Sequence, residues 1–202
     1  TIPALAEGTL VEEDAPVPEE FVVNAYSAIL LNMDTGQVLY EYEADSINPP
    51  ASTTKIMTAL LCLEHGDPKD VITVSDVIYT VSDQASKGNL VVGEVMTIHQ
   101  VLQQMLVVSA SEATVVVAEY VAGDVETFVD MMNAKAQELG CTNTHFTNTH
   151  GLPNSEHYTS ARDLSKIAMA AMEYEEFRDI VSQAVTTVAP TNVHGTQTII
   201  ST

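Results

Sequence analysis

The amino-acid sequence predicts an α+β protein in which a helical cluster packs on an antiparallel sheet. Three observations lead to this fold class. Of the 202 residues, 46% are hydrophobic, the proportion expected of a globular protein that buries a core. β-Prone runs come first, over residues 26–42, and most of the chain after residue 75 carries apolar residues at helical spacing. Strands that precede the helices favour α+β over alternating βαβ units.

The first elements are a β-hairpin and the helix that follows it. Two β-prone runs, 27–31 and 37–40, flank the turn signal Asp34-Thr35-Gly36. Pro49-Pro50 then interrupts the chain, and residues 52–64 carry apolar side chains at helical spacing before a glycine stop. The sequence therefore predicts a hairpin that leads, through a proline break, into a helix.

The later elements are mostly helices. A short β-prone stretch covers 71–74, and the helical patterns after it cover 97–108, 112–122, 125–139 and 161–173. A two-stranded hairpin is marginal alone, so the sheet needs further strands, and the only late candidate is 185–188. We therefore expect the C-terminal strands of the sheet to be missing from this chain.

The charge balance limits the partners of the chain. The formal net charge is −21, from 28 acidic and 7 basic residues, and the first basic residue is Lys55. Phosphate contacts need a basic surface, so nucleic-acid binding is not expected. No apolar run approaches the roughly 18 residues of a membrane span, and residues 1–20 form an acidic, proline-containing stretch expected to be an extended leader. Its Ala4-Leu5-Ala6 step is compatible with the remnant of a signal-peptide cleavage site.

The spacings of the cysteines and histidines do not predict a metal site. Cys62 and Cys141 lie far apart without a C-x-x-C pair, and Cys62 falls in an apolar helical run where burial is expected. The spacings of His145, His150 and His157 do not place them on one helical face. These histidines are expected to be scaffold and loop residues, and no metal or cofactor is predicted.

Ser52 and Lys55 are the strongest candidates for chemistry. Three residues apart at the start of a helix, they place an amine within reach of a hydroxyl. A lysine whose pKa is lowered by burial can take the proton of a serine and make it a nucleophile. A bare S-x-x-K pair is common, however, and far more often consists of a helix cap and a solvated lysine.

The surrounding sequence changes that interpretation. The segments that matter are 27–40, Asn48-Pro49-Pro50-Ala51-Ser52-Thr53-Thr54-Lys55, and His145-Phe146-Thr147-Asn148-Thr149-His150-Gly151-Leu152-Pro153 with its continuation to residue 164. In this order they resemble the serine D-alanyl-D-alanine carboxypeptidases, low-molecular-weight penicillin-binding proteins of peptidase family S11. The resemblance covers about residues 22–200 and implies a β-lactamase/transpeptidase-like fold.

The resemblance also implies a function. It indicates a bacterial, extracytoplasmic enzyme that acts on peptidoglycan stem peptides through an acyl-enzyme on Ser52, with Lys55 as base. β-Lactam antibiotics would acylate the same serine, and no cofactor is implied. The extracellular setting would permit a disulfide between Cys62 and Cys141, and the sequence leaves this open.

A second family motif, S-x-N, is incomplete here. Ser109 matches its serine, which the resemblance implicates in proton transfer, but Ser111 replaces the asparagine that contacts the substrate backbone. A hydroxyl cannot supply both a carbonyl and an NH₂ group, so reduced activity is expected. On the motif alone, both serines are also read as caps of the following helix.

A third family motif, K-T-G, is absent from the 202 residues. In the family its strand supplies a cation for the substrate carboxylate and one oxyanion-hole N–H, and losing one such donor costs about 3 kcal/mol of transition-state stabilisation. We therefore expect residues 21–202 to be the N-terminal part of the domain, truncated before this strand and poorly active alone. A second chain or a missing C-terminal part would complete the sheet, and a C-terminal segment beyond Thr202 would provide any membrane association.

Two alternative functions remain at this stage. The incomplete S-x-N and missing K-T-G are also features expected of a non-catalytic, penicillin-sensing or wall-binding homologue. A class A β-lactamase would share S-x-x-K but would carry Asp-Asn after Ser109, where this chain has Ala110-Ser111.

Overall fold

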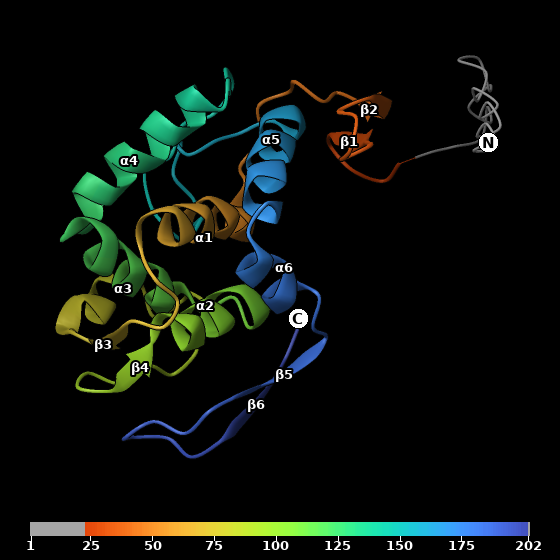
Figure 1. Cartoon of the computed structure of the whole chain (residues 1–202). Helices are drawn as coiled ribbons and strands as arrows, with labels where there is room; N and C mark the ends of the chain where they lie inside the picture. The colour runs from red at the N-terminus through yellow and green to blue at the C-terminus, as the bar shows by residue number, and fades with distance from the viewer. Residues whose placement is uncertain (1–22, 202) are drawn as a thin grey trace, which may run out of the picture.

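The computed structural model describes residues 23–201, so the leader expected over residues 1–20 lies outside the described part. Its elements follow in chain order (Figure 1): β1 (Ala28–Leu31), β2 (Val38–Tyr42), the 3-10 turn η1 (Ala51–Thr53), α1 (Thr54–His65), β3 (Val71–Thr73), the 3-10 turn η2 (Asp76–Thr80), β4 (Val95–Thr97), α2 (Ile98–Val107), α3 (Ser111–Ala122), α4 (Val125–Glu138), α5 (Ala161–Met172), α6 (Glu175–Val181), β5 (Val185–Val188) and β6 (Gln197–Ile200).

Helix α1 lies in the middle of the helical cluster. It contacts α2, α3, α4, α5 and α6, and Figure 1 shows these helices around it. Leu60, Leu61 and Cys62 are at most 3% exposed, as expected for a helix that is covered on most of its faces. The predicted burial of Cys62 is confirmed. A single large apolar core therefore surrounds the helix that carries Lys55.

The strands form three separate two-stranded antiparallel sheets in the described part of the chain. Strand β1 pairs with β2 as predicted, and Asn32 organises the turn by accepting the N–H groups of Asp34 and Thr35 at 2.9 and 3.1 Å. The grouping of the other strands differs from the expected single sheet. The 185–188 segment pairs with β6 instead of extending β1–β2, and β3 pairs with β4.

Polar contacts attach the β5–β6 hairpin to the helical cluster. Three glutamines of α2 donate to it: Gln100 to Ala189 O at 2.9 Å, Gln103 to Thr186 Oγ1 at 3.2 Å and Gln104 to Gln197 Oε1 at 2.9 Å. In Figure 1 this hairpin lies below α2 and α6, at the opposite end of the molecule from β1–β2. The hairpin is therefore held along α2.

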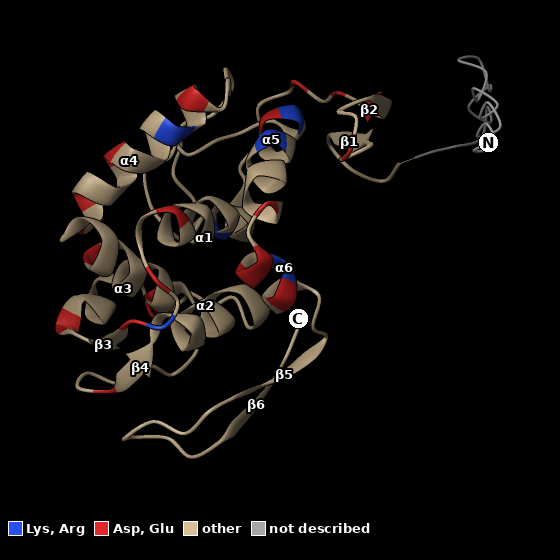
Figure 2. Cartoon of the chain, in the orientation of Figure 1, with Lys and Arg blue, Asp and Glu red and all other residues tan. Residues whose placement is uncertain are grey.

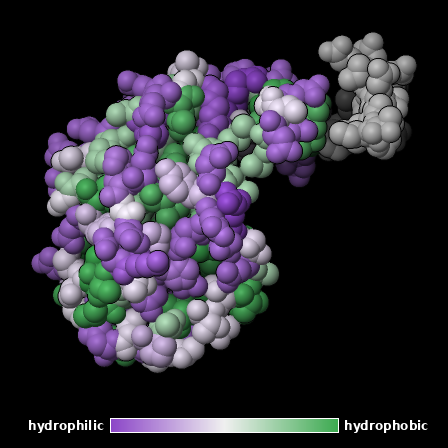
Figure 3. All heavy atoms as spheres, in the orientation of Figure 1, coloured by the Kyte–Doolittle hydropathy of each residue, from purple (hydrophilic) through white to green (hydrophobic). Residues whose placement is uncertain are grey.

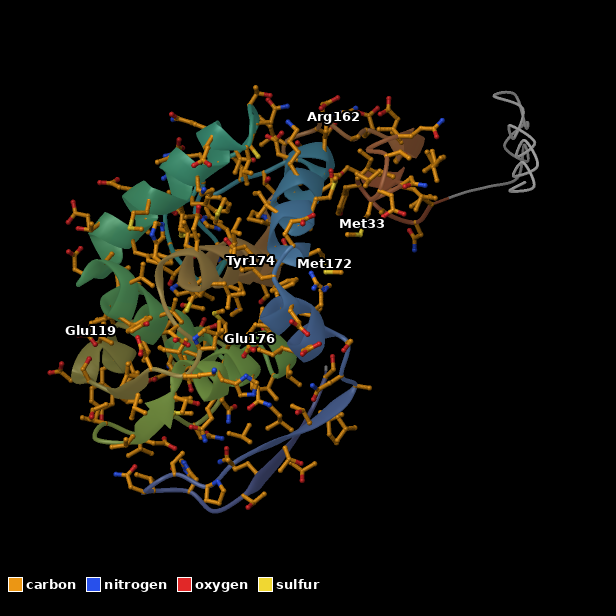
Figure 4. The ribbon with its side chains drawn as sticks, viewed as in Figure 1. Met33, Glu119, Arg162, Met172, Tyr174 and Glu176 are labelled. Atoms are coloured by element: carbon orange, nitrogen blue, oxygen red, sulfur yellow. The ribbon has the colours of Figure 1, made fainter. Side chains whose placement is uncertain are left out.

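The β1–β2 hairpin is tied to α5 by ion pairs. Arg162 lies at the end of α5 nearest β1 and β2 (Figure 4) and bonds to Glu41 at 2.7 Å and Asp45 at 2.8 Å. These carboxylates raise the pKa of the Arg162 guanidinium, mainly through the hydrogen bond that it donates to Asp45. Ser160 caps the same helix by accepting the N–H of Asp163 at 3.1 Å.

The charged side chains follow the acidic composition. Figure 2 shows Asp and Glu on several helices and connecting segments, with Lys and Arg at fewer places along the ribbon. In the space-filling view the same face is mainly hydrophilic, with smaller apolar patches (Figure 3). None of the helices within residues 23–201 is both long and apolar enough to cross a membrane.

Candidate active site

Ser52 lies on a tight turn that precedes α1. Pro50 is followed by Ala51 in a left-handed conformation, φ 49°, and residues Ala51–Thr53 form the 3-10 turn η1. The N-cap of α1 is Thr53, whose side chain makes no capping bond. The interpretation of Ser52 as a helix cap is therefore wrong. Its side chain is instead free to face the pocket described below.

Lys55 is buried beside Ser52. Its Nζ donates to Ser52 Oγ at 3.2 Å and to the carbonyl oxygen of His150 at 3.0 Å, and the residue is only 3% exposed. Burial lowers the pKa of the Lys55 amine to about 8, against a smaller opposing effect of the Glu112 carboxylate. An amine with this pKa exchanges its proton near neutral pH, as a general base must.

Ser109 and Ser111 lie at the start of α3. Ser109 has φ 58°, and its Oγ is buried with no hydrogen-bond partner among the described residues. Ser111 is the first residue of the helix, 3% exposed, and its N–H donates to Ser86 O at 2.9 Å. The N-cap is Ala110 and no side chain caps this helix, so the capping interpretation of both serines is wrong.

The segment 144–158 supports the turn that carries Ser52 from the other side. Gly151 has φ +88°, and a Cβ added there would lie 1.8 Å from Ala51 O. Asn148 shapes this loop by accepting the N–H groups of His150 and Gly151 at 3.2 and 2.7 Å. Only glycine allows the loop backbone to approach the residue before Ser52 so closely.

His157 links this segment to α1. Its Nδ1 accepts the N–H of Thr147 at 3.0 Å, so its Nε2–H is left to donate to Thr54 Oγ1 at 2.8 Å. Burial, and to a smaller extent His145, lowers the pKa of His157 to about 4, which keeps the ring neutral in this arrangement. His157 thus has the scaffold position expected from the sequence.

A pocket of about 480 Å³ joins the candidate residues. Ser52, Lys55 and Ser109 line it together, whereas Ser111 is not among its lining residues. The remaining walls are mainly apolar and come from α1, α2 and α6, with Ser201 after β6: Ile56, Met105, Leu106, Val107, Phe177 and Val181. The structure therefore brings three of the four predicted site residues to one cavity and places the fourth behind it.

Several residues at this site were missed by sequence reasoning. Glu112 is buried beside the Ser109 turn, the carbonyl of His150 accepts the Lys55 amine, and Phe177 of α6 closes the pocket. The only sequence signal for Glu112 was its position in the first turn of a predicted helix, where an acidic residue is ordinary. The contact with His150 joins positions 95 residues apart and leaves no local signal.

Neither the histidines nor the cysteines form a metal cluster within residues 23–201. Cys62 and Cys141 are both buried free thiols, and burial raises the pKa of the Cys62 thiol to about 12. Cys141 Sγ contacts the carbonyl oxygen of Asp163 at 3.6 Å. The two thiols thus act as small packing groups.

Comparison with known proteins identifies the family. The family model described as D-alanyl-D-alanine carboxypeptidase, peptidase S11, matches residues 12–198. The D-alanyl-D-alanine carboxypeptidase DacF of Bacillus subtilis (strain 168) is 40% identical over 174 residues, which are 84% of this chain and 44% of that protein. The D-alanyl-D-alanine carboxypeptidase of Streptomyces sp. (strain K15) is 34% identical over 187 residues, which are 88% of this chain and 64% of that protein.

Solved structures agree with this assignment. A single-residue variant of the Streptomyces K15 DD-transpeptidase superposes with a TM-score of 0.83 at 30% identity, over 90% of this chain and 75% of that one. The predicted α+β, β-lactamase/transpeptidase-like fold is thereby confirmed. The chain spans 44% and 64% of the length of the two curated relatives. By sequence and by fold, the chain belongs to the D-alanyl-D-alanine carboxypeptidase family, peptidase S11.

Proposed function

We propose that this protein is a serine-type D-alanyl-D-alanine carboxypeptidase that acts on peptidoglycan stem peptides through an acyl-enzyme on Ser52. The observation that carries the proposal is the 3.2 Å hydrogen bond between Lys55 Nζ and Ser52 Oγ, made by a buried amine in a pocket shared with Ser109. Membership of the family and the names of the relatives support the reaction class.

The reaction begins with the neutral form of Lys55. Its amine accepts the hydroxyl proton as Ser52 Oγ attacks the carbonyl carbon that joins the two terminal D-alanines. The tetrahedral intermediate collapses when the C–N bond breaks, and the departing amine takes a proton that Ser109 relays from the Lys55 ammonium. Water then attacks the Ser52 ester, and Oγ regains its proton. One D-alanine is released and one water is consumed.

In this proposal Ser111 does not replace the substrate contact that an asparagine would make. Its single hydroxyl makes one hydrogen bond in a given direction, whereas an amide presents an acceptor and a donor to a peptide backbone. The Ser111 side chain is nearly buried and does not line the pocket. Its role in this proposal is to support the Ser109 turn, so its effect on the substrate is indirect. We therefore expect this enzyme to be slower than a relative that carries the asparagine.

β-Lactams react with the same serine in this proposal. Attack on the lactam carbonyl opens the ring, and the cleaved amine stays tethered to the acyl group, so it does not diffuse away as D-alanine does. The acyl-enzyme therefore persists and becomes a convenient label for Ser52.

The setting of the enzyme is part of the proposal. Peptidoglycan stem peptides lie outside the cytoplasm, so the protein would act there in a bacterium, as its relatives' bacterial sources suggest. The 202 residues contain no Lys-Thr-Gly, so in this proposal a further segment or a second chain would supply the cation and the oxyanion N–H that the family resemblance assigns to a K-T-G strand. Membrane association through a further C-terminal segment fits the same arrangement.

The direct test is covalent labelling with a fluorescent penicillin. Both this chain and the complete product of its gene are incubated with the label, with release of D-alanine from a D-alanyl-D-alanine peptide measured in parallel. We expect labelling and release by the complete product, no labelling after Ser52→Ala, and unchanged labelling after Ser155→Ala, a control at an exposed loop serine. Equal labelling of the Ser52→Ala protein would eliminate Ser52 as nucleophile. Absence of both reactions in the complete product would favour a non-catalytic homologue.

The pH dependence of acylation gives a second test. Only the neutral form of Lys55 accepts the serine proton, and its pKa is about 8. The acylation rate is therefore expected to rise about tenfold per pH unit below this value and to level off above it. Initial rates of penicillin labelling between pH 6 and 9.5 measure the profile. A rate that falls through this range would contradict Lys55 as base.

A further inference from the structure

Glu112 is a buried acidic residue to which the proposed reaction gives no role. It lies in the first turn of α3, three positions after Ser109, and is 2% exposed. Its Oε1 accepts the backbone N–H groups of Gly88 at 2.7 Å and Leu90 at 3.4 Å. Its Oε2 is buried without a hydrogen-bond partner in the described part of the chain. A carboxylate oxygen left in this state is unfavourable for folding, which directs attention to its function.

The Oε1 contacts belong to a clamp around the Ser109 turn. The loop that Glu112 holds also accepts the Ser111 N–H at Ser86 O, at 2.9 Å. Gly88 of this loop packs so closely that a Cβ there would lie 2.8 Å from Ala110 Cβ. Ser109 keeps its left-handed φ of 58° inside the clamp. A non-glycine residue persists in such a conformation only where its surroundings hold it there.

The charge of Glu112 acts on Lys55. Two elements besides its own helix bring titratable groups to Lys55: α3 brings Glu112, and the segment 144–158 brings His150. Burial, followed by the charges of Lys55, His157 and Lys87, lowers the pKa of His150 to about 4, so that ring is neutral at physiological pH. Glu112 is thus the carboxylate that opposes the effect of burial on Lys55.

We propose that Glu112 is a positioning residue for the reaction of Ser52: one carboxylate oxygen clamps the loop that holds the Ser109 turn, and the negative charge of the carboxylate balances Lys55. The inference rests on the proposed function. Its two parts separate by substitution, since Glu112→Gln keeps an acceptor oxygen for Gly88 and Leu90 but removes the charge, whereas Glu112→Ala removes both.

The experiment combines a titration with a rate profile. Lysine side chains are isotopically labelled, Lys55 is assigned from the Lys55→Arg spectrum, and its titration midpoint is measured by NMR. In Glu112→Gln we expect the midpoint to fall by about half a unit or more, and the pH profile of penicillin acylation to move to lower pH by the same amount. In Glu112→Ala we expect the same shift together with slower acylation across the whole pH range.

The matched control is Glu119→Gln. Glu119 lies near the other end of α3 (Figure 4), where its carboxylate accepts the Ser75 hydroxyl at 2.7 Å, away from the pocket. This variant is expected to leave both the Lys55 midpoint and the acylation profile unchanged. Thermal melting of each variant reports whether it is folded.

The outcomes distinguish the proposals. An unchanged Lys55 midpoint in Glu112→Gln would overturn the charge role, even if acylation slowed. Wild-type acylation rates in a folded Glu112→Ala protein would overturn the clamp. The NMR titration does not depend on turnover, so a shifted midpoint in a complete gene product that neither labels nor releases D-alanine would refute the carboxypeptidase proposal and, with it, the reaction role of Glu112.

Discussion

Replacing Lys55 with methionine is expected to make the protein more stable and nearly inactive. The pKa of the buried amine falls from 10.5 to about 8. Below pH 8, where Lys55 is charged in both states, this difference destabilises the folded state by about 3 kcal/mol. Methionine carries no charge, so this cost disappears. The carbonyl oxygen of His150 loses its hydrogen-bond donor, which lowers the free energy of unfolding by about 1 kcal/mol. The net gain is about 2 kcal/mol at pH 7, with acylation slower by about 10²–10⁴-fold because the proposed base is gone.

The pH dependence of this gain identifies its cause. The folded-state pKa of Lys55 lies below that of the unfolded chain, so between about pH 8 and 10.5 the unfolded chain binds the extra proton. The wild-type free energy of unfolding therefore rises relative to that of the variant through this window, and the advantage of methionine fades. Urea unfolding at pH 7, 8.5 and 10 measures it. The control, Lys69→Met at an exposed lysine, is expected to change stability by less than about 0.5 kcal/mol. A Lys55→Met protein no more stable than wild type at pH 7 would contradict the argument.

Local sequence patterns predicted the regular elements well. The hairpin, α1 and the four later helices agree with their expected ranges to within about two residues at each end, the usual uncertainty of helix bounds. Thr97 shows why, since it caps α2 in a reciprocal pair with Gln100 that is visible in the sequence. Helix α6 was missed because its seven residues bury only Phe177 and Ile180, too few for a helical period.

Local sequence patterns could not predict which strands pair. Residues 185–188 were recognised as β-prone, but their partner β6 was not, because it is a four-residue run that includes glutamine and threonine. Among the contacts that hold this hairpin are side-chain bonds from α2, made by glutamines in a helix whose sequence shows only an ordinary amphipathic pattern. Tertiary contacts of this kind decide which strands form one sheet.

The candidate site was predictable only where it is local. Ser52 and Lys55 are three residues apart on one turn, so their contact follows from helix geometry. The approach of Ser109 to the same pocket depends on how α1, α2 and α3 pack. The left-handed conformations of Ala51 and Ser109, on either side of the pocket, could not be read from residue types that normally avoid them. Both residues are held there by distant parts of the chain.

Gly151→Ala is expected to lower stability and to displace Ser52, because a steric clash and an unfavourable backbone conformation coincide at one residue. The new Cβ would lie 1.8 Å from Ala51 O and 2.3 Å from Ala51 C, atoms that cannot rotate away as a side chain would. The φ of +88° is also unfavourable for alanine, by about 1–2 kcal/mol. Overpacking adds about 1–3 kcal/mol. We therefore expect a total loss of about 2–5 kcal/mol, with the turn that carries Ser52 displaced.

The variant Gly140→Ala distinguishes the effect of the steric contact with Ala51 from the effect of a left-handed backbone conformation. Gly140 has a similar φ of +72°, but nothing lies within 4 Å of an added Cβ. This variant is expected to lose only the 1–2 kcal/mol of the left-handed conformation and to label with penicillin at the wild-type rate. In Gly151→Ala the labelling rate should fall by about 100-fold, because a displacement of about 1 Å at a nucleophile has that effect. Equal stability and labelling of the two variants would show that the approach of Gly151 to Ala51 does not position Ser52. A loss confined to Gly151→Ala would mean that a loop about a hundred residues away in sequence holds the reacting hydroxyl in place.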